Sequence, residues 1–244
     1  MPTGMTAPLL TSGLYRLGIR DVRYACYARV SGTTPGMGLP HVDGVTARVL
    51  AENAVRHLGA LHSWIPGGDA QRTLREPLDH GGFVSRAALV SDVDTLARTD
   101  RFGFVAGHLL DGLAAIADRA PLYARAVVPV HADCHWGNWL ACAGKVTALL
   151  DFEWARFGEP LDDWFFLARY GGPHMEVVLD VIAHATAIPV DFLRAECEVR
   201  EAAHLVSDLR IALERAHTPS PMAIGRLRGL EELIVERYWW CQAS

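Results

Sequence analysis

The sequence predicts an α+β fold, in which a short β-containing segment is followed by a mostly helical remainder. Residues 23–30 are β-rich, alternate in polarity and are followed by the turn-forming pair Ser31-Gly32. After Pro160, apolar residues recur at helical spacing over most of the remaining chain. Between these two parts the sequence indicates a strand, a loop, a hairpin and a second loop, and polar residues gather in the two loops.

The first hundred residues predict one clear helix. Residues 1–20 show no pattern, and residues 33–39 form a loop rich in glycine and proline. Apolar residues recur near helical spacing over residues 43–64, where Asp43 is the expected N-cap. Residues 65–100 contain two glycine pairs with weak helical signals between them, which indicates an insertion or a lid.

The second part begins with a helix over residues 102–119 and a short strand over residues 127–130. Residues 139–142 and 146–150 flank an Ala-Gly-Lys turn, which is a hairpin signature. The helices expected after this hairpin cover residues 161–170, 173–185, 191–216 and 222–240.

Composition and charge exclude several classes of protein. Of the 244 residues, 50% are hydrophobic and 21% are charged, which is ordinary for a globular protein. The net charge of −5 gives no basic footprint for nucleic acid or for an anionic membrane. No signal peptide and no apolar run of roughly 20 residues is found, and the five cysteines are scattered without a Cys-x-x-Cys pair. We therefore expect a cytoplasmic protein with reduced thiols and with neither nucleic acid nor a membrane as its partner.

The residues that carry chemistry are concentrated between His131 and Asp163. The loop after the short strand reads His-Ala-Asp-Cys-His-Trp-Gly-Asn, and Asp133 and Asn138 stand five residues apart in it. Asp151 follows at the end of the second strand of the hairpin. Because a hairpin folds back on itself, we expect Asp151 to return to the neighbourhood of Asn138. Two carboxylates and an amide oxygen on one small surface suit Mg²⁺.

Phosphoryl transfer needs such a set of groups. One carboxylate orients the attacking hydroxyl and takes its proton, while an Asn and an Asp hold Mg²⁺ against the nucleotide phosphates. Protein kinases have a catalytic Asp, an Asn five residues later and then a metal-binding Asp, and Asp133, Asn138 and Asp151 follow the same order. The alternative is a polar loop whose side chains only satisfy backbone groups.

In these segments the chain resembles the aminoglycoside phosphotransferase family, whose relatives include choline and homoserine kinases. The family signature reads roughly H-G-D-x-H-x-x-N, I-D-[FW] and G-D-P-x-x-D-[LI], and here it stands as HADCHWGN, LLDFEWA and GEPLDDW. The resemblance implies a protein-kinase-like fold, with Asp133 as the catalytic base and with Asn138 and Asp151 as ligands of Mg²⁺. It also implies ATP or GTP as co-substrate, and it makes Asp163 the closing Asp that supports the catalytic loop.

The resemblance extends over about residues 23–240. The segment LGALH, which ends at His62, is similar to a family helix that ends in L-x-x-L-H. Residues 27–32 resemble the hinge strand that carries the adenine, so Ala28 and Val30 are the nucleotide-binding residues that the resemblance implies. The implied division of the chain is a remnant N-terminal lobe with the hinge and a helical C-terminal lobe with the catalytic loop and the metal site, over residues 1–40 and 41–244.

The sequence also departs from the family pattern. Ala132 replaces Gly in the catalytic loop, and Glu159 replaces the Asp before Pro160. No glycine-rich phosphate loop and no Lys precede the hinge, and the single lysine, Lys145, stands in the central hairpin. We therefore expect a reduced N-terminal β lobe, with the loss of one charge-assisted contact to the nucleotide. An apolar patch exposed by the reduced lobe would favour a homodimer through that face.

Several other residues near the loop have two interpretations. Glu153 is a candidate for a second metal or a cationic substrate, or else a solvated carboxylate. His135 either orients Asp133 or touches the substrate, or it has a structural role, and Trp154 is a candidate for lining the acceptor pocket. His131 is expected to hydrogen-bond within the loop, with catalysis as the alternative.

Two further alternatives concern this loop. The alternation of His131, Asp133 and His135 also allows a transition-metal site, although no further ligands stand at a recognisable spacing. Cys134 lies beside the proposed base but has no evident activating partner in the sequence, so a buried thiol is expected.

The sequence therefore predicts a kinase that moves the γ-phosphate of ATP or GTP to a hydroxyl of a small molecule. Aminoglycoside-like, choline-like and homoserine-like acceptors, or another antibiotic, are compatible with the resemblance. The alternative is a catalytically degenerate relative that binds a ligand or a partner, because the phosphate loop and its lysine are missing. A third alternative is that the sequence begins too late and that an upstream segment would complete the lobe.

Overall fold

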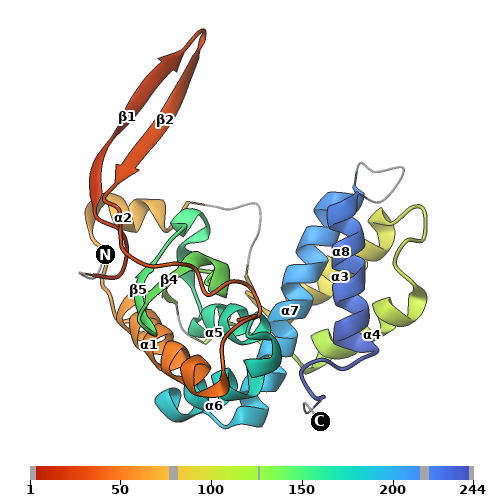
Figure 1. Cartoon of the computed structure of the whole chain (residues 1–244). Coiled ribbons are helices and arrows are strands. Elements are labelled where there is room, and N and C mark those ends of the chain that lie inside the picture. Colours follow the sequence, from red (N-terminus) through yellow and green to blue (C-terminus); the bar gives the residue numbers. More distant parts are fainter. Residues whose placement is uncertain (1–3, 77–81, 126, 215–219, 242–244) are drawn as a thin grey trace.

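The computed structural model describes residues 4–76, 82–125, 127–214 and 220–241. A β-hairpin projects from a body that is mostly helical (Figure 1). In the hairpin, strand β1 (Leu9–Leu17) pairs antiparallel with β2 (Arg20–Tyr27). The prediction of a strand at residues 23–30 is confirmed for the part that belongs to β2. The prediction missed β1, because every residue of the hairpin is exposed and no buried face imposes an alternating pattern.

The hairpin at the start of the chain exposes large apolar side chains. Its side chains Leu10, Leu14, Leu17 and Ile19 are all more than half exposed. Dimerisation through this face stays a prediction.

Helix α1 (Gly44–His62) begins where the sequence indicates. The Asp43 carboxylate accepts a hydrogen bond from the Thr46 N–H, Oδ1 to N 2.7 Å, which confirms the predicted N-cap. The apolar face of α1 includes Leu50, Leu58 and Leu61, which are almost completely buried, and the helix packs against α6 (Met175–Thr186).

The segment that was expected to be an insertion or a lid contains α2 (Gly68–Thr73) and α3 (Arg86–Thr99). Helix α3 packs against α4 (Gly107–Arg119) and α7 (Val190–Leu213), so it is part of the body. The start of α4 was predicted five residues too early, at residue 102. The Asp100 carboxylate accepts hydrogen bonds from the N–H groups of Phe104 and Val105, which hold these residues in a turn before the helix.

The central β elements form two small sheets. Strands β4 (Trp139–Cys142) and β5 (Lys145–Leu149) make the predicted hairpin, whose turn residues Ala143 and Gly144 both have positive φ. Strand β3 (Val128–Val130) pairs antiparallel with β6 (Arg156–Gly158), a strand that the sequence analysis missed. This second pairing brings the loop after β3 beside the segment that leads into α5 (Pro160–Arg169).

The C-terminal half is helical, as predicted. Helix α5 is buried over residues 161–168, and α7 lies against α5 and α8 (Pro221–Ile234). The predicted helix over residues 222–240 is too long, because the chain turns after α8 and buries Trp239, whose Nε1–H donates to Glu201, 2.6 Å. The last residues of the predicted helix 191–216 lie outside the described part of the chain. None of the described helices is long and apolar enough to cross a bilayer.

Candidate active site

The loop after β3 is held by one buried carboxylate. Asp163, in the first turn of α5, accepts hydrogen bonds from two successive backbone amides: His131 N to Oδ2, 3.1 Å, and Ala132 N to Oδ1, 2.7 Å. The Asp163 side chain is completely buried. Its partners are the amides of the loop and a histidine, so in this structure its carboxylate holds the loop that leads to Asp133.

The histidine is His62, at the end of α1. Its Nε2 lies 2.8 Å from Oδ2 of Asp163, and its ring packs edge-on against Trp164. Although burial alone would raise it, the hydrogen bond and charge of His62, together with the Ala132 amide, hold the pKa of Asp163 below its usual value. Helix α1, the loop and α5 therefore meet at one ionised carboxylate.

Ala132 has a left-handed backbone conformation, with φ of 61°. Such a conformation costs an alanine free energy that glycine does not lose. It turns the chain sharply between the buried His131 and the half-buried Asp133. The family signature has glycine here, and the structure gives the physical reason.

Asp133 and Asn138 are in direct contact. The Asn138 Nδ2 donates to the Asp133 carbonyl, 2.8 Å, and to its carboxylate Oδ2, 3.2 Å. Burial raises the pKa of the Asp133 carboxyl, and the nearby His135 and His131 oppose this rise. With its Nδ2 facing Asp133, the side chain of Asn138 leaves Oδ1 as the atom that can bind a cation.

The end of the β4–β5 hairpin is tied to the same loop. The Leu150 N–H donates to the Asn138 carbonyl, 2.8 Å, and the Leu150 carbonyl lies 2.8 Å from Nε2 of His131. The next residue, Asp151, is exposed and has a φ of 63°. Its charge is near enough to contribute to the pKa of Asp133. The hairpin therefore returns Asp151 to the neighbourhood of Asn138.

These residues fit a hard divalent cation better than a transition metal. Carboxylate and amide oxygens are what Asp133, Asn138 and Asp151 offer, and such oxygens suit Mg²⁺. Both ring nitrogens of His131 are engaged, Nε2 with Leu150 and Nδ1 with the Asp133 amide at 3.3 Å. Within the described ranges, no group of three or more His, Cys, Asp or Glu residues could hold a metal ion. The alternative transition-metal interpretation therefore has no support.

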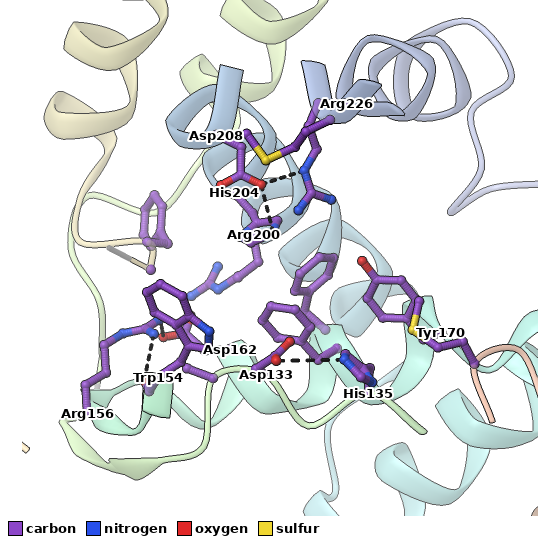
Figure 2. A pocket seen from close by; sticks show the side chains of 17 residues that line it. Asp133, His135, Trp154, Arg156, Asp162, Tyr170, Arg200, His204, Asp208 and Arg226 are labelled. Atoms are coloured by element: carbon purple, nitrogen blue, oxygen red, sulfur yellow. Dashed lines mark hydrogen bonds and ion pairs between the residues drawn. The ribbon is translucent and has the colours of Figure 1, made fainter. Parts of the chain in front are cut away.

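A cavity of about 440 Å³ opens beside Asp133 (Figure 2). Its wall combines residues of the catalytic loop, of the segment around residue 82, of α5, α7 and α8, and of the turn before β6. The lining residues are Met37, Gly82, Phe83, Ala132, Asp133, His135, Trp154, Arg156, Asp162, Phe165, Phe166, Tyr170, Arg200, His204, Asp208, Met222 and Arg226.

Of the candidate residues around the loop, His135 and Trp154 line this cavity and Glu153 does not. The Nδ1 of His135 accepts the Gly137 N–H, 3.1 Å, and its Nε2 lies 3.8 Å from Asp133. Glu153 is exposed in the short turn η2 (Phe152–Trp154).

Cys134 is completely buried, and burial raises the pKa of its thiol well above the usual value. Its Sγ donates to the Asp163 carbonyl, 3.2 Å. This surrounding disfavours the thiolate that a nucleophile needs, and it agrees with the expected buried thiol.

The segment that resembles the adenine hinge is only partly a strand. Strand β2 ends at Tyr27, and the Ala28 N–H donates to the Pro8 carbonyl, 2.8 Å. In this conformation the Ala28 amide is therefore not available to hydrogen-bond the base of a nucleotide. Five residues later, Thr33 exchanges two backbone hydrogen bonds with Ala141 of β4, 3.0 and 2.9 Å. Val30 lies between these two anchored points.

Several cavity residues were missed by the sequence analysis, chiefly Asp162 and the arginines Arg156, Arg200 and Arg226. Asp162 stands next to Asp163 in the printed motif, and this doublet was the one signal that could have identified it. The arginines come from β6, α7 and α8, and only the packing of these elements brings them to one cavity.

Comparison with known proteins gives a family. Residues 8–200 match the model of the phosphotransferase enzyme family. A search of curated proteins found no match to the sequence.

Solved structures with a similar fold include phosphotransferases of two kinds. An aminoglycoside 2'-phosphotransferase-IIIa in complex with GDP has a TM-score of 0.71 at 16% identity, over 95% of this chain and 76% of that one. A thermostable mutant of aminoglycoside phosphotransferase APH(4)-Ia, with ADP and hygromycin B, has a TM-score of 0.61 at 15% identity, over 100% and 80%. The macrolide 2'-phosphotransferase MphH from Brachybacterium faecium has a TM-score of 0.54 at 20% identity, over 86% and 69%. These likenesses confirm the predicted α+β, protein-kinase-like fold with a small N-terminal sheet.

Proposed function

Because the chain belongs to the phosphotransferase enzyme family, we propose that it transfers the γ-phosphate of ATP or GTP to a hydroxyl of a small molecule bound in the cavity beside Asp133. The contact between Asn138 and Asp133, a residue that lines this cavity, carries the proposal. The proposed site of action is the cytoplasm, where nucleotides are abundant and the free cysteines stay reduced.

In the proposed mechanism Asp133 orients the acceptor hydroxyl and takes its proton as the new oxygen–phosphorus bond forms. The bond between the γ-phosphorus and the bridging oxygen breaks in the same step, and the nucleoside diphosphate leaves. A carboxylate whose pKa is raised by burial is a stronger base, which suits this role. Asn138 holds this carboxylate through its Nδ2, 3.2 Å, and Asp163 fixes the backbone that carries it. Most of the rate enhancement would come from positioning and from electrostatics.

Asn138 and Asp151 are the proposed ligands of Mg²⁺. When bound, Mg²⁺ would neutralise charge on the transferring phosphate and on its leaving group. The proposed acceptor is a hydroxylated small molecule, and the first panel to assay contains aminoglycoside-like, macrolide-like, choline-like and homoserine-like compounds. The similar structures concern aminoglycoside and macrolide phosphotransferases, which supports starting from this panel.

A second candidate function is ligand or partner binding without phosphoryl transfer. It is favoured by the Ala28 N–H, which donates to the Pro8 carbonyl, 2.8 Å, and is therefore not available to a nucleotide base in this conformation. Under this alternative, nucleotide with Mg²⁺ would not stabilise the fold.

A thermal-shift titration with ATP and GTP, each with and without Mg²⁺, separates the two functions. A kinase is expected to show a rise in Tm that needs both nucleotide and Mg²⁺. Turnover on the acceptor panel should then fall about 10²- to 10⁴-fold in Asp133→Asn, with little change in Tm, because a base is removed and not a packing group. Asp118→Asn, on the exposed face of α4, is the matched control. No stabilisation by either nucleotide at millimolar concentration supports the binding module instead.

A further inference from the structure

Asp162 is a buried carboxylate in the wall of the cavity, next to Arg156 and Trp154 in Figure 2. Its side chain is 3% exposed. One oxygen, Oδ2, accepts a hydrogen bond from the Arg156 Nη2, 3.2 Å. The other oxygen, Oδ1, is buried and has no hydrogen-bond partner among the residues that the structure describes.

The backbone around Asp162 encloses the oxygen that is already paired. A Cβ built on Gly82 would lie 2.6 Å from Oδ2, and one built on Gly158 would lie 2.7 Å from the same atom. Both distances are too short for a real side chain, so glycine at these positions lets the carboxylate sit where it does. Since Arg156 and the two glycines lie against Oδ2 and Asp162 lines the cavity, we take the cavity as the side from which a donor of a ligand would approach this carboxylate.

An unpaired buried carboxylate oxygen costs free energy that the fold does not recover. Burial raises the pKa of Asp162 to about 6, although Arg156 and Arg200 act in the opposite direction and Asp163 and Glu159 act with it. The partners of the ionised Asp162 carboxylate therefore do not fully offset the free energy that its burial costs. Such a group is expected to bind a donor from a ligand when one enters the cavity.

The other arginines of the cavity wall form ion pairs, although the Nε atoms of Arg200 and Arg226 are buried without a hydrogen-bond partner among the described residues. Arg200 lies against Glu196, Nη1 to Oε2 2.5 Å, and against Glu159, while Arg226 lies 2.6 Å from Asp208. The cavity therefore has no large excess of negative charge to attract a polycation. Much of its remaining wall is apolar, with contributions from Phe83, Phe165, Phe166, Trp154 and Met222.

We propose that Asp162 is a specificity-determining residue that binds a second hydrogen-bond donor of the acceptor, a hydroxyl or an amine. The preferred acceptor then has an apolar body, one hydroxyl presented to Asp133 and a separate donor that reaches Asp162. This inference rests on the proposed function, because it takes the cavity as the acceptor site.

Binding of three matched fragments to the full chain tests the inference directly. The probes are 1-phenylethanol, 1-phenylethane-1,2-diol and 2-amino-1-phenylethanol, which share an aromatic ring and one hydroxyl and differ in the second donor. The dissociation constants are measured by ligand-observed NMR at pH 7.5. We expect the diol or the amino alcohol to bind about tenfold more tightly than 1-phenylethanol. Comparing the diol with the amino alcohol shows whether a hydroxyl or an amine is the preferred second donor. Equal affinity of all three fragments for the wild type overturns the inference.

Asp162→Asn shows whether the preference comes from this residue. Arg156 needs an acceptor, so the amide oxygen is expected to stay with Arg156 and its NH₂ group to face the cavity, where it repels a donor. The preference for the second donor should disappear in this variant and persist in Asp118→Asn. A preference that survives in folded Asp162→Asn overturns the assignment. If the variant does not fold, the comparison of the three fragments on the wild type still decides.

Asp133→Asn separates this inference from the proposed function. Loss of turnover with an unchanged fragment preference is the result that both proposals expect. If turnover is absent from the wild type but the preference depends on Asp162, the cavity binds such molecules without phosphorylating them, and only the proposed function fails. If turnover is present and the preference is absent, only the role of Asp162 fails.

Discussion

The imidazole of His62 and the carboxylate of Asp163 meet at 2.8 Å, Nε2 to Oδ2, although 101 residues separate them in the chain. Through Asp163 this contact reaches the amides of His131 and Ala132, and so the backbone just before Asp133. The end of α1 and the start of α5 thus position the loop of the candidate active site.

Breaking this contact should destabilise the protein. His62→Ala removes one partner of a buried carboxylate and should lower the free energy of unfolding by about 1–3 kcal/mol. Asp163→Asn should cost at least as much, because it also weakens the bonds to two backbone amides. Urea unfolding at pH 7.5 measures both. An unchanged free energy of unfolding in both variants would contradict the role given to Asp163.

The same carboxylate should contribute to the acid sensitivity of the fold. Since the pKa of Asp163 is lowered on folding, its contribution is present above the unfolded-state pKa of about 3.9 and is lost as the pH falls below it. The difference in stability between the wild type and Asp163→Asn should therefore shrink as the pH is lowered from 6 toward 3. A difference that stays constant over this range would show that the charge of Asp163 is not involved.

Ala132→Gly should stabilise the protein. The left-handed conformation at residue 132 is strained for alanine and is not strained for glycine, so a gain of about 0.5–1 kcal/mol is expected. Ala114→Gly, at an exposed position in the middle of α4, is the control and should lose about 1 kcal/mol, because glycine weakens a helix interior. Thermal unfolding of the two variants distinguishes relief of strain from a general effect of glycine.

Asp162 should give the opposite pH dependence to Asp163. Burial raises its pKa to about 6, with Asp163 and Glu159 adding to the rise and Arg156 and Arg200 opposing it. The folded state then binds more protons than the unfolded state between about pH 4 and pH 6, so stability is lost as the pH rises through this window. Over this window Asp162→Asn should gain stability relative to the wild type, by up to about 3 kcal/mol.

Urea unfolding of the wild type and Asp162→Asn at several values between pH 4 and pH 7.5 checks this sign. The absolute stability of the variant also includes the loss of the ion pair with Arg156, so the slope of the difference is the informative quantity. If the free energies of unfolding of the two proteins change with pH in parallel, a raised pKa of Asp162 is contradicted.

The proposed metal ligands predict a change in the requirement for Mg²⁺. Asn138→Ala and Asp151→Asn should raise the Mg²⁺ concentration needed for half-maximal stabilisation by nucleotide, about tenfold or more for each variant. Asp111→Asn, an exposed carboxylate on α4, should leave it unchanged. The readout is the rise in Tm at a fixed concentration of ATP or GTP. An unchanged Mg²⁺ requirement in Asp151→Asn would remove this residue from the metal site.

The predictions from sequence succeeded where a local rule applied. The N-cap at Asp43, the β4–β5 hairpin and the four helices of the C-terminal half depend on neighbours within a few residues, and the structure contains all of them. The errors have several causes. Strand β1 has no buried face, and α4 begins late because Asp100 holds a turn before it. Strand β6 and the end of α8 depend on distant contacts, with β3 and with Glu201. The motifs HADCHWGN, LLDFEWA and GEPLDDW indicated the fold and the family without knowledge of these contacts.

The sequence by itself determined which chemistry to expect, because the order and spacing of Asp133, Asn138 and Asp151 are properties of one short stretch of chain. Only the tertiary structure decided what surrounds that chemistry. The side chains that line the cavity come from elements as far apart in the sequence as the segment at Gly82 and helix α8. Their positions follow from packing, which no local sequence pattern encodes. The unpaired oxygen of Asp162 likewise could be identified only from the tertiary structure. Its burial and its lack of a partner among the described residues are properties of the folded chain.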